Sequence, residues 1–483
     1  MMATDASEFR IFASVVGKLL DQFAWWSFLL LLAVSSFIDD IYPSKHWLLI
    51  TAGFCFALTL HLFGTALGAR CNYRGIRSSA PVVGLFAVGL LWLVLQILVP
   101  AQHYGHELLL SNALDKHAAP PWFNPNLSWS VTPIETRHLL FSELICLLAL
   151  LLMLSMLCTR QRLRQVLLIV TIVAGVHAVS AITAKYADTS LVDTAQLDGH
   201  FTVARGWFIN RNHLASFLIL TSVGWMSVFL HRCLRSDTGG TLIARIFTKR
   251  MLVSIPSVMV MVLIVIAVTL TSSRAGIVSV LILFLVFALT TMKRNSQARW
   301  TLSLLAGMTL FVSLLVVYFG EGVLQRFSGQ EGLLGERGEQ WQATWLLIKH
   351  NVLLGYGGNS YATLFQMVRD NDGLRQLIYN QAHNDYLHIW FEQGIVGLAL
   401  WLGVIAVTFY KGIASLKRTQ STLVAAAIIA SLATLGAALM QSLVDFNLQI
   451  LSIRIYFFVI IAIVVSVPSI RHIKLNDVHV RSQ

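Results

Sequence analysis

The chain has 483 residues, of which 56% are hydrophobic and 12% charged; its formal net charge is +12 and its mean hydropathy +0.71. This composition excludes an ordinary soluble globular protein, and the length leaves no room for a large soluble domain beside membrane helices. We therefore treat residues 1–483 as a single integral membrane domain. The first residues contain no short apolar stretch that ends in a small-residue cleavage site, so we expect no cleaved signal peptide.

Twelve apolar runs approach the length of about 20 residues that a helix needs to cross a bilayer. They predict an all-α polytopic membrane protein with about 12 transmembrane helices. In chain order the runs lie near 23–38, 46–68, 80–99, 139–158, 164–183, 213–231, 251–270, 275–292, 300–319, 387–410, 422–441 and 449–468.

The placement of Lys and Arg predicts the orientation, because positive residues favour the cytoplasmic side of short connections. If the N-terminus is inside, every basic cluster falls on one side of the membrane, which predicts an N-in, C-in topology. The positive charge is then a topology signal, and we expect the lipid bilayer but no nucleic acid as a partner. The clusters lie at 10–18, 70–77, 160–164, 232–250, 293–299, 411–418 and 471–481.

Three outer segments, 100–138, 184–212 and 320–386, are too long to be simple connectors, and long loops in compact chains are usually functional. In the third, Trp341, Trp345 and Ile348 recur at helical spacing, which predicts an amphipathic helix near 339–350. We expect large loops on the outer side of the membrane that carry amphipathic helices against the bundle or the membrane surface.

The five cysteines lie in the expected spans or inner connections, and no pair has the spacing of metal ligands. We therefore expect neither a disulfide, nor a metal, nor a cofactor.

Three arginines, Arg205, Arg211 and Arg274, lie at outer ends of spans, where positive residues are depleted. A guanidinium group is always charged and its planar fork suits phosphate oxygens, so these residues are candidates for binding a diphosphate. The alternative is that they extend to lipid headgroups or pair with a carboxylate. For Arg211 a further alternative is that its neighbours merely cap the following helix.

The segment 382–387 (Ala-His-Asn-Asp-Tyr-Leu) stands directly before the tenth apolar run. His383 is the candidate proton acceptor, because an imidazole can take a hydroxyl proton as the oxygen attacks. Asn384 and Asp385 are candidate supporting residues. The alternative is an ordinary helix start, with Asn384 or Asp385 as the cap.

Other polar residues at the span ends are candidates for a supporting role. Arg337 could contact a phosphate or a sugar, or pair with a neighbouring glutamate on its own helix. Asp445 and Glu392 are ionisable groups at membrane depth, which usually face a cavity. Arg454 could pair with one of these two carboxylates or bind a ligand.

Four segments of the chain together resemble the O-antigen ligase and O-antigen polymerase superfamily of bacterial membrane glycosyltransferases. The resemblance covers roughly residues 130–465, and the order and spacing of the motifs make the combination specific. The motifs are 206–212 (Gly-Trp-Phe-Ile-Asn-Arg-Asn), 271–276 (Thr-Ser-Ser-Arg-Ala-Gly), an amphipathic helix from 341 that leads to 351–357 (Asn-Val-Leu-Leu-Gly-Tyr-Gly), and 382–387 followed by 392–398 (Glu-Gln-Gly-Ile-Val-Gly-Leu).

The resemblance implies a GT-C-like membrane enzyme of the bacterial inner membrane, with its active site facing the periplasm. Such enzymes transfer a glycan from undecaprenyl diphosphate to an acceptor sugar hydroxyl without a metal. By position, the diphosphate role falls on Arg205, with Arg211 as a competitor, and on Arg274, and the activating role on His383. The chain departs from the family pattern at Trp207, Gln441 and Leu451, which blurs the subfamily but affects no named role.

The resemblance leaves the acceptor open. A polymerase would extend another lipid-linked repeat, with a chain-length regulator as a further partner, whereas a ligase would transfer to lipid A–core. The Asn-Arg-Asn-His variant at 210–213 and the Pro-rich first loop favour the polymerase. The alternative of another class is a lipid-linked glycan flippase or transporter, which predicts ionisable residues at mid-span instead of at the outer ends. A scaffold without activity would leave the Arg and His residues at the span ends unexplained.

Overall fold

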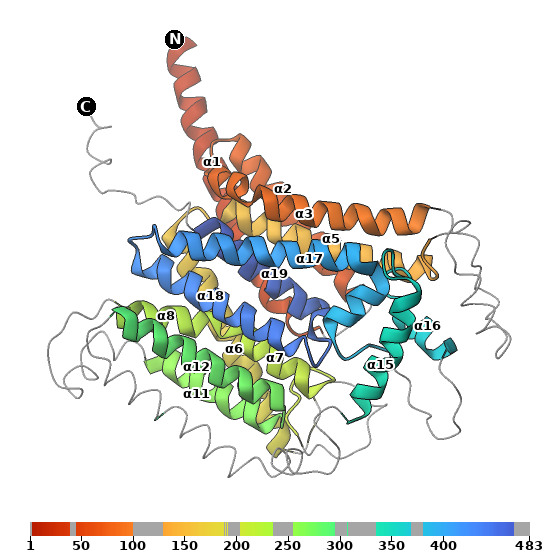
Figure 1. Ribbon diagram of the computed structural model, residues 1–483. Helices are drawn as coiled ribbons and strands as arrows, with labels where there is room; N and C mark the ends of the chain where they lie inside the picture. Colours follow the sequence, from red (N-terminus) through yellow and green to blue (C-terminus); the bar gives the residue numbers. More distant parts are fainter. Residues whose placement is uncertain are drawn as a thin grey trace.

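The computed structural model describes residues 2–38, 45–99, 129–187, 189, 191, 203–234, 255–294, 307, 335–368 and 380–467. Every regular element among these residues is a helix, as predicted, and the helices pack into one bundle (Figure 1). The elements are α1 (Met2–Ser35), α2 (Lys45–Ala66), α3 (Tyr73–Leu98), α5 (Pro133–Met156), α6 (Arg160–Tyr186), α7 (Arg211–Thr221), α8 (Val223–Leu234), α11 (Ile255–Leu270), α12 (Arg274–Arg294), α15 (Gly335–His350), α16 (Tyr361–Val368), α17 (Asp385–Leu416), α18 (Thr422–Gln441), the short 3₁₀ helix η1 (Asn447–Gln449) and α19 (Leu451–Ser466).

Eight helical segments are long and apolar enough to cross a membrane, with α7 and α8 counted as one, and α11, α12 and α19 are shorter apolar helices. This confirms a polytopic, all-helical membrane protein. Apart from residue 307, the expected run 300–319 lies outside the described residues, so the total of about 12 spans and the N-in, C-in topology stay predictions.

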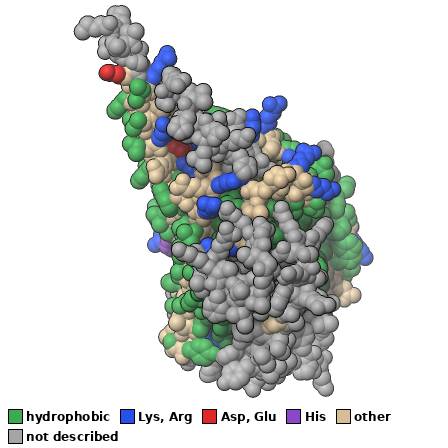
Figure 2. Space-filling view, turned by 90° about the vertical axis from the view of Figure 1, so that its left-hand side faces the viewer, with side chains coloured by type: hydrophobic (Ala, Val, Ile, Leu, Met, Phe, Trp, Pro, Cys, Tyr) green, Lys and Arg blue, Asp and Glu red, His purple; other side chains and the backbone are tan. Residues whose placement is uncertain are grey.

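Apolar side chains cover much of the outside of the bundle. Leu49, Leu98 and Tyr410 are exposed by 70, 69 and 74%, and hydrophobic side chains line the flanks of the face in Figure 2. Such a surface would be unfavourable in water but suits contact with lipid.

The long segments between spans differ in detail from the prediction. Helix α5 begins at Pro133, inside the expected loop 100–138, because proline at the first helical position fits the helix without losing a hydrogen bond. The rest of that loop, 100–128, lies outside the described residues, as do 192–202, 320–334 and 369–379 of the other two segments.

The predicted amphipathic helix is present as α15. Ile348 is buried, whereas Trp345, on the same predicted apolar face, is 38% exposed. Gln340 and Thr344 are also buried, and both bond to the hydroxyl of Tyr361.

Helix α19 lies at the centre of the bundle, and all of its 16 residues are buried (Figure 1). A helix that is apolar on every side is expected to be surrounded by other helices. Around it lie α3, α5, α7, α17 and α18. Because α19 starts directly after η1, this packing also fixes the turn between α18 and α19.

Helix α17 is broken at Gly394, whose φ of 66° and ψ of −175° are not helical. The break frees backbone groups that must be satisfied at membrane depth. The backbone N–H groups of Tyr356 and Gly357 donate to the carbonyls of Phe391 and Glu392, at 3.0 and 2.8 Å. The Gly-x-Gly segment (residues 355–357) therefore satisfies two carbonyls at the break, and Gln96 and Trp92 of α3 also donate there, to the carbonyls of Glu392 and Gln393 at 3.0 and 2.9 Å.

Two tightly placed glycines make this contact possible. A Cβ on Gly394 would overlap the backbone of Leu353, and one on Gly355 would overlap the backbone of Gly394 and Glu392. Both glycines also have positive φ, which costs other L-residues about 1–2 kcal/mol. The Gly-x-Gly segment thus fixes the first turns of α17. These turns directly follow or overlap residues 382–387, which we call the signature motif.

We expect Gly394→Ala to lower the stability of the protein by more than about 2 kcal/mol. The backbone strain at positive φ and the overlap of the new Cβ with the backbone of Leu353 both contribute to this loss. Gly84→Ala in α3 is the matched control, since a Cβ there meets nothing within 4 Å. Thermal unfolding in detergent should show a clear loss for the first variant and little change for the second. Equal melting temperatures for both variants would contradict the proposed packing.

Candidate functional site

His383 stands directly before α17 in a left-handed backbone conformation, with a φ of 49°. Residues other than glycine occupy this region at a cost, and such strain often accompanies function. The next residue, Asn384, caps α17 by accepting hydrogen bonds from the N–H groups of Tyr386 and Leu387, at 3.0 and 3.1 Å. Its amide also donates to the carbonyl of Leu443 at 2.9 Å. The cap therefore ties the signature motif to the turn that follows α18.

The buried carboxylate of Asp445 is contacted by groups from its own turn and from three other segments of the chain. Its Oδ1 lies 3.3 Å from Nδ1 of His383, and its Oδ2 lies 3.6 Å from Nη2 of Arg337 on α15. The amide of Asn212, near the start of α7, donates to Oδ2 at 2.5 Å, and the backbone N–H of Phe446 donates to Oδ1 at 3.0 Å. The structure thus brings together three predicted residues, His383, Arg337 and Asp445.

Arg337 also donates through Nη1 to the carbonyl of Val444. One guanidinium group therefore holds both the backbone and the side chain of the turn after α18. Its side chain is still 34% exposed, so part of the fork remains accessible.

Burial alone would raise the pKa of Asp445. The hydrogen bond from His383 and the positive charge of Arg337 outweigh this and lower the pKa of Asp445 to about 2. The carboxylate is therefore ionised at physiological pH and only accepts hydrogen bonds. It follows that Nδ1 of His383 carries the proton in this contact, which leaves Nε2 of the neutral ring as the basic nitrogen.

Asp385 supports the same turn from inside. It is fully buried, and its carboxyl group accepts hydrogen bonds from the backbone of Leu448 at 3.1 Å and the amide of Gln449 at 3.2 Å. Its own N–H donates to the carbonyl of Ser442 at 2.9 Å. These contacts make Asp385 a structural support of the turn, and a substrate would have to displace the turn to reach it.

The expected pairing of Arg454 with Asp445 or Glu392 is wrong. Arg454 pairs with Glu143 of α5 at 2.6 Å and donates to two carbonyls of η1. The partner lies on a helix distant in sequence, so no local pattern indicated it.

Arg205 and Arg274 lie on neighbouring segments. The N–H of Ala204 donates to the carbonyl of Leu270 at 2.9 Å, which holds the segment of Arg205 against the end of α11, shortly before Arg274. Both arginines are half-buried. Among the described residues, the buried Nε of Arg205 has no hydrogen-bond partner. Ser272, in the turn before Arg274, has a φ of 52°, a second strained residue within a signature motif.

Helix α12 packs closely against α7. A Cβ on Gly276 would lie 2.9 Å from that of Ala215, so the two helices approach closely where both begin. The two helix starts carry Arg274 and Arg211, and each start also presents the positive end of its helix dipole. This end of the bundle is therefore suited to an anion.

Asn212 is a member of the site that was not expected from the sequence. Asn210 caps α7 by accepting a hydrogen bond from the N–H of Asn212 at 2.9 Å, which leaves the side chain of Asn212 free to reach Asp445. The sequence signal for this contact was the pair of asparagines at 210 and 212. The cap of α7 needs only one of them, so the other is available for a different contact. Phe446 was also missed; its ring lies edge-on between those of His213 and His383, at centroid distances of 4.7 and 4.8 Å.

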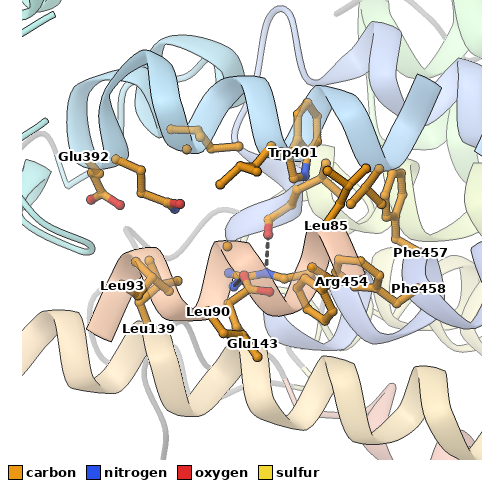
Figure 3. Close-up of a pocket in the computed structure, with 18 of the residues that line it drawn as sticks. Leu85, Leu90, Leu93, Leu139, Glu143, Glu392, Trp401, Arg454, Phe457 and Phe458 are labelled. Atoms are coloured by element: carbon orange, nitrogen blue, oxygen red, sulfur yellow. Dashed lines mark hydrogen bonds and ion pairs between the residues drawn. The ribbon is translucent and has the colours of Figure 1, made fainter. Parts of the chain in front are cut away.

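A cavity of about 70 Å³ lies between α3, α5, α17 and α19 (Figure 3). Its walls are mostly apolar, with the Glu143–Arg454 pair and Glu392 among the lining residues. It could hold a few water molecules, and it is far smaller than the roughly 300–1,000 Å³ of a typical ligand site. Of the candidates named from the sequence, Glu392 and Arg454 line it, so Glu392 faces a cavity as expected, whereas His383, Asp445 and the arginines expected at the diphosphate do not.

Residues 259–402 match the profile of the family described as O-antigen ligase. The matched part includes the turn at 271–276, α15, the Gly-x-Gly segment and the motif 382–387, and for this part of the chain it confirms the resemblance inferred from the sequence. The motif 206–212 lies outside the match. No curated protein matches the chain.

The ionised state of Asp445 predicts a pH dependence of stability. Its pKa falls from 3.8 to about 2 on folding, so the stabilisation is complete above about pH 4 and is lost as the pH falls toward 2. The lost contribution amounts to roughly 2 kcal/mol. Thermal unfolding of the wild type and of Asp445→Asn should differ at pH 7, and this difference should shrink between about pH 4 and pH 2.5.

The matched control is Glu135→Gln, which removes the carboxylate of a partly exposed pair with His138. Exposed pairs contribute at most about 1 kcal/mol, so this variant should melt close to the wild type. If the difference in stability between the wild type and Asp445→Asn stays constant down to pH 2.5, the low pKa of Asp445 is contradicted.

Proposed function

We propose that this protein transfers a glycan from undecaprenyl diphosphate to the hydroxyl of an acceptor sugar, at the periplasmic face of the bacterial inner membrane. The observation that carries the proposal is the contact of His383 with the ionised Asp445, beside helix starts that bear arginines. The family match over residues 259–402 supports the same class of reaction.

His383 is proposed as the general base. Asp445 accepts from Nδ1 and thereby orients the ring, and Nε2 takes the proton of the acceptor hydroxyl as its oxygen attacks C1 of the donor sugar. The bond between C1 and the diphosphate oxygen breaks, and its electron pair leaves with the diphosphate. Attack from the side opposite the leaving group inverts the anomeric centre. The proton then passes from His383 to solvent, which its 28% exposed side chain can reach.

The leaving diphosphate gains negative charge, which fixed cations can stabilise. Arg274 and Arg205 are proposed to bind it, with Arg211 as the competitor of Arg205 at the start of α7. Arg337 is held by Asp445 and is proposed to contact a phosphate or a sugar with the exposed part of its fork. Asn384 and Asp385 are proposed to act as supports, through the cap and the turn. These arginines supply the positive charge, so the proposed reaction needs no metal.

The acceptor distinguishes two versions of the proposal. We favour a polymerase that extends a lipid-linked repeat, with a chain-length regulator as a partner, because of the Asn-Arg-Asn-His variant and the Pro-rich first loop. The second candidate is a ligase that transfers to lipid A–core. It is supported by the family match, whose description is O-antigen ligase.

A flippase or transporter for lipid-linked glycans is the alternative of another class. Transport across the membrane usually needs ionisable groups along the path at mid-span. The groups assembled here around Asp445 lie at helix ends and in the turns between helices. Their arrangement favours chemistry at one surface over passage through the bundle.

Incubation of the purified protein in lipid vesicles with an undecaprenyl-diphosphate glycan tests the proposal. A ladder of longer glycans without a second acceptor indicates the polymerase, and transfer only after addition of lipid A–core indicates the ligase. Both reactions should proceed in the presence of EDTA. Movement of the donor between leaflets without any glycan transfer would refute the enzymatic proposal and support a flippase.

In the same assay, Arg274→Ala should lower kcat/KM for the lipid-linked donor by about 100-fold, the usual effect of removing one group that stabilises developing charge. The KM for the acceptor should change much less. Arg164→Ala is the control, because Arg164 is exposed at the start of α6, on an element that does not contribute to the site. Equal losses for donor and acceptor would count against a role of Arg274 at the diphosphate.

A further inference from the structure

His388 and Glu392 lie one turn apart on the buried face of α17, and each is only 1% exposed. Nε2 of His388 lies 3.1 Å from Oε1 of Glu392. Two ionisable groups buried at membrane depth are expensive, so they need a structural or functional cause. The proposed mechanism uses neither of them.

The pair joins two backbone segments of the site. Nδ1 of His388 accepts a hydrogen bond from the N–H of Ala382 at 3.4 Å, directly before the strained His383. Oε1 of Glu392 accepts from the N–H of Tyr361 at 3.2 Å. Because Nδ1 accepts here, Nε2 is the ring nitrogen that can carry a proton toward Glu392; the two atoms are close, but their geometry is not that of a hydrogen bond.

The side chain of Tyr361 extends this connection to α15. Its ring packs on that of His388 at 5.2 Å, and its hydroxyl bonds to Gln340 at 3.2 Å and to Thr344 at 2.8 Å. Gln340 also donates to the carbonyl of Gln381 at 2.6 Å. The helix that carries Arg337 and the segment that carries His383 are thus held by one buried cluster.

A second hydrogen bond from α15 also holds the segment before His383. The indole N–H of Trp341 donates to the carbonyl of Ala382 at 2.9 Å. Both backbone groups of Ala382 are therefore fixed, the N–H by His388 and the carbonyl by Trp341. A backbone fixed on both sides can keep the next residue, His383, in its unfavourable conformation.

We propose that His388 and Glu392 are a positioning pair, which holds the backbone at Ala382 so that His383 and Arg337 meet at Asp445. The expected effect on the reaction rate rests on the proposed function; the effect on the backbone does not. His388 acts through the peptide N–H of Ala382 and touches no substrate.

Two substitutions of similar polarity separate the role of each ring nitrogen. His388→Asn places an amide oxygen near the position of Nδ1 and can still accept from Ala382. His388→Gln places its polar group near the position of Nε2 and leaves the backbone N–H of Ala382 without an acceptor. Hydrogen exchange of the peptide 380–384, measured by mass spectrometry on the full protein, should speed up at least 10-fold in the Gln variant. The Asn variant should stay within about 3-fold of the wild type.

The transfer assay gives the second readout. The Gln variant should lose at least 10-fold in kcat with little change in KM for the donor, and the Asn variant should retain most of the kcat. His61→Leu is the matched control, because it removes another buried histidine–carboxylate pair, with Asp21 at 2.8 Å, between α1 and α2. It should reduce stability without changing the exchange of 380–384.

Equal exchange and equal kcat in the Asn and Gln variants would overturn the positioning role, and so would faster exchange in His61→Leu alone. A wild-type protein that transfers no glycan, while the exchange differs between the variants as described, would refute the proposed function and leave the positioning role standing.

Discussion

A buried carboxylate is the constraint on which the arrangement of the site depends. Burying an ionised group without partners costs several kcal/mol, so the turn that carries Asp445 is stable only where positive or donating groups surround it. His383, Arg337 and Asn212 meet this demand from three distant parts of the chain. The negative charge of Asp445, which the fold must stabilise, is therefore the same charge that orients His383, the candidate base.

The broken helix α17 explains how these groups reach the membrane surface in a fixed geometry. Two carbonyls before Gly394 accept hydrogen bonds from the Gly-x-Gly segment, which follows α15. This segment holds α15 beside the first turns of α17 (Figure 1). Arg337 lies on α15, and His383 lies shortly before α17. Two motifs that look independent in the sequence form a single rigid support in the fold.

The helices could be predicted because length and apolarity are local properties of the sequence. His383 and Asp445 could be named as candidates because polar residues at span ends are conspicuous. The contact of Asn212 with Asp445 was not expected, since the two residues are 233 positions apart. For Arg454, pairing with Asp445 or Glu392 was left open beside a ligand role, and its partner is Glu143 instead. Both differences concern tertiary contacts, which no spacing within one segment can reveal.

If Asp445 serves the reaction through His383, the two side chains form one functional unit, and a double-mutant cycle can show this. Glycan transfer would be measured for the wild type, His383→Gln, Asp445→Asn and the double variant. If Asp445 orients the base, His383→Gln costs about 10²–10⁴-fold and the second substitution adds almost nothing, as expected for groups that act as a unit. Losses that multiply in the double variant would contradict the claim, because the two residues would then contribute independently.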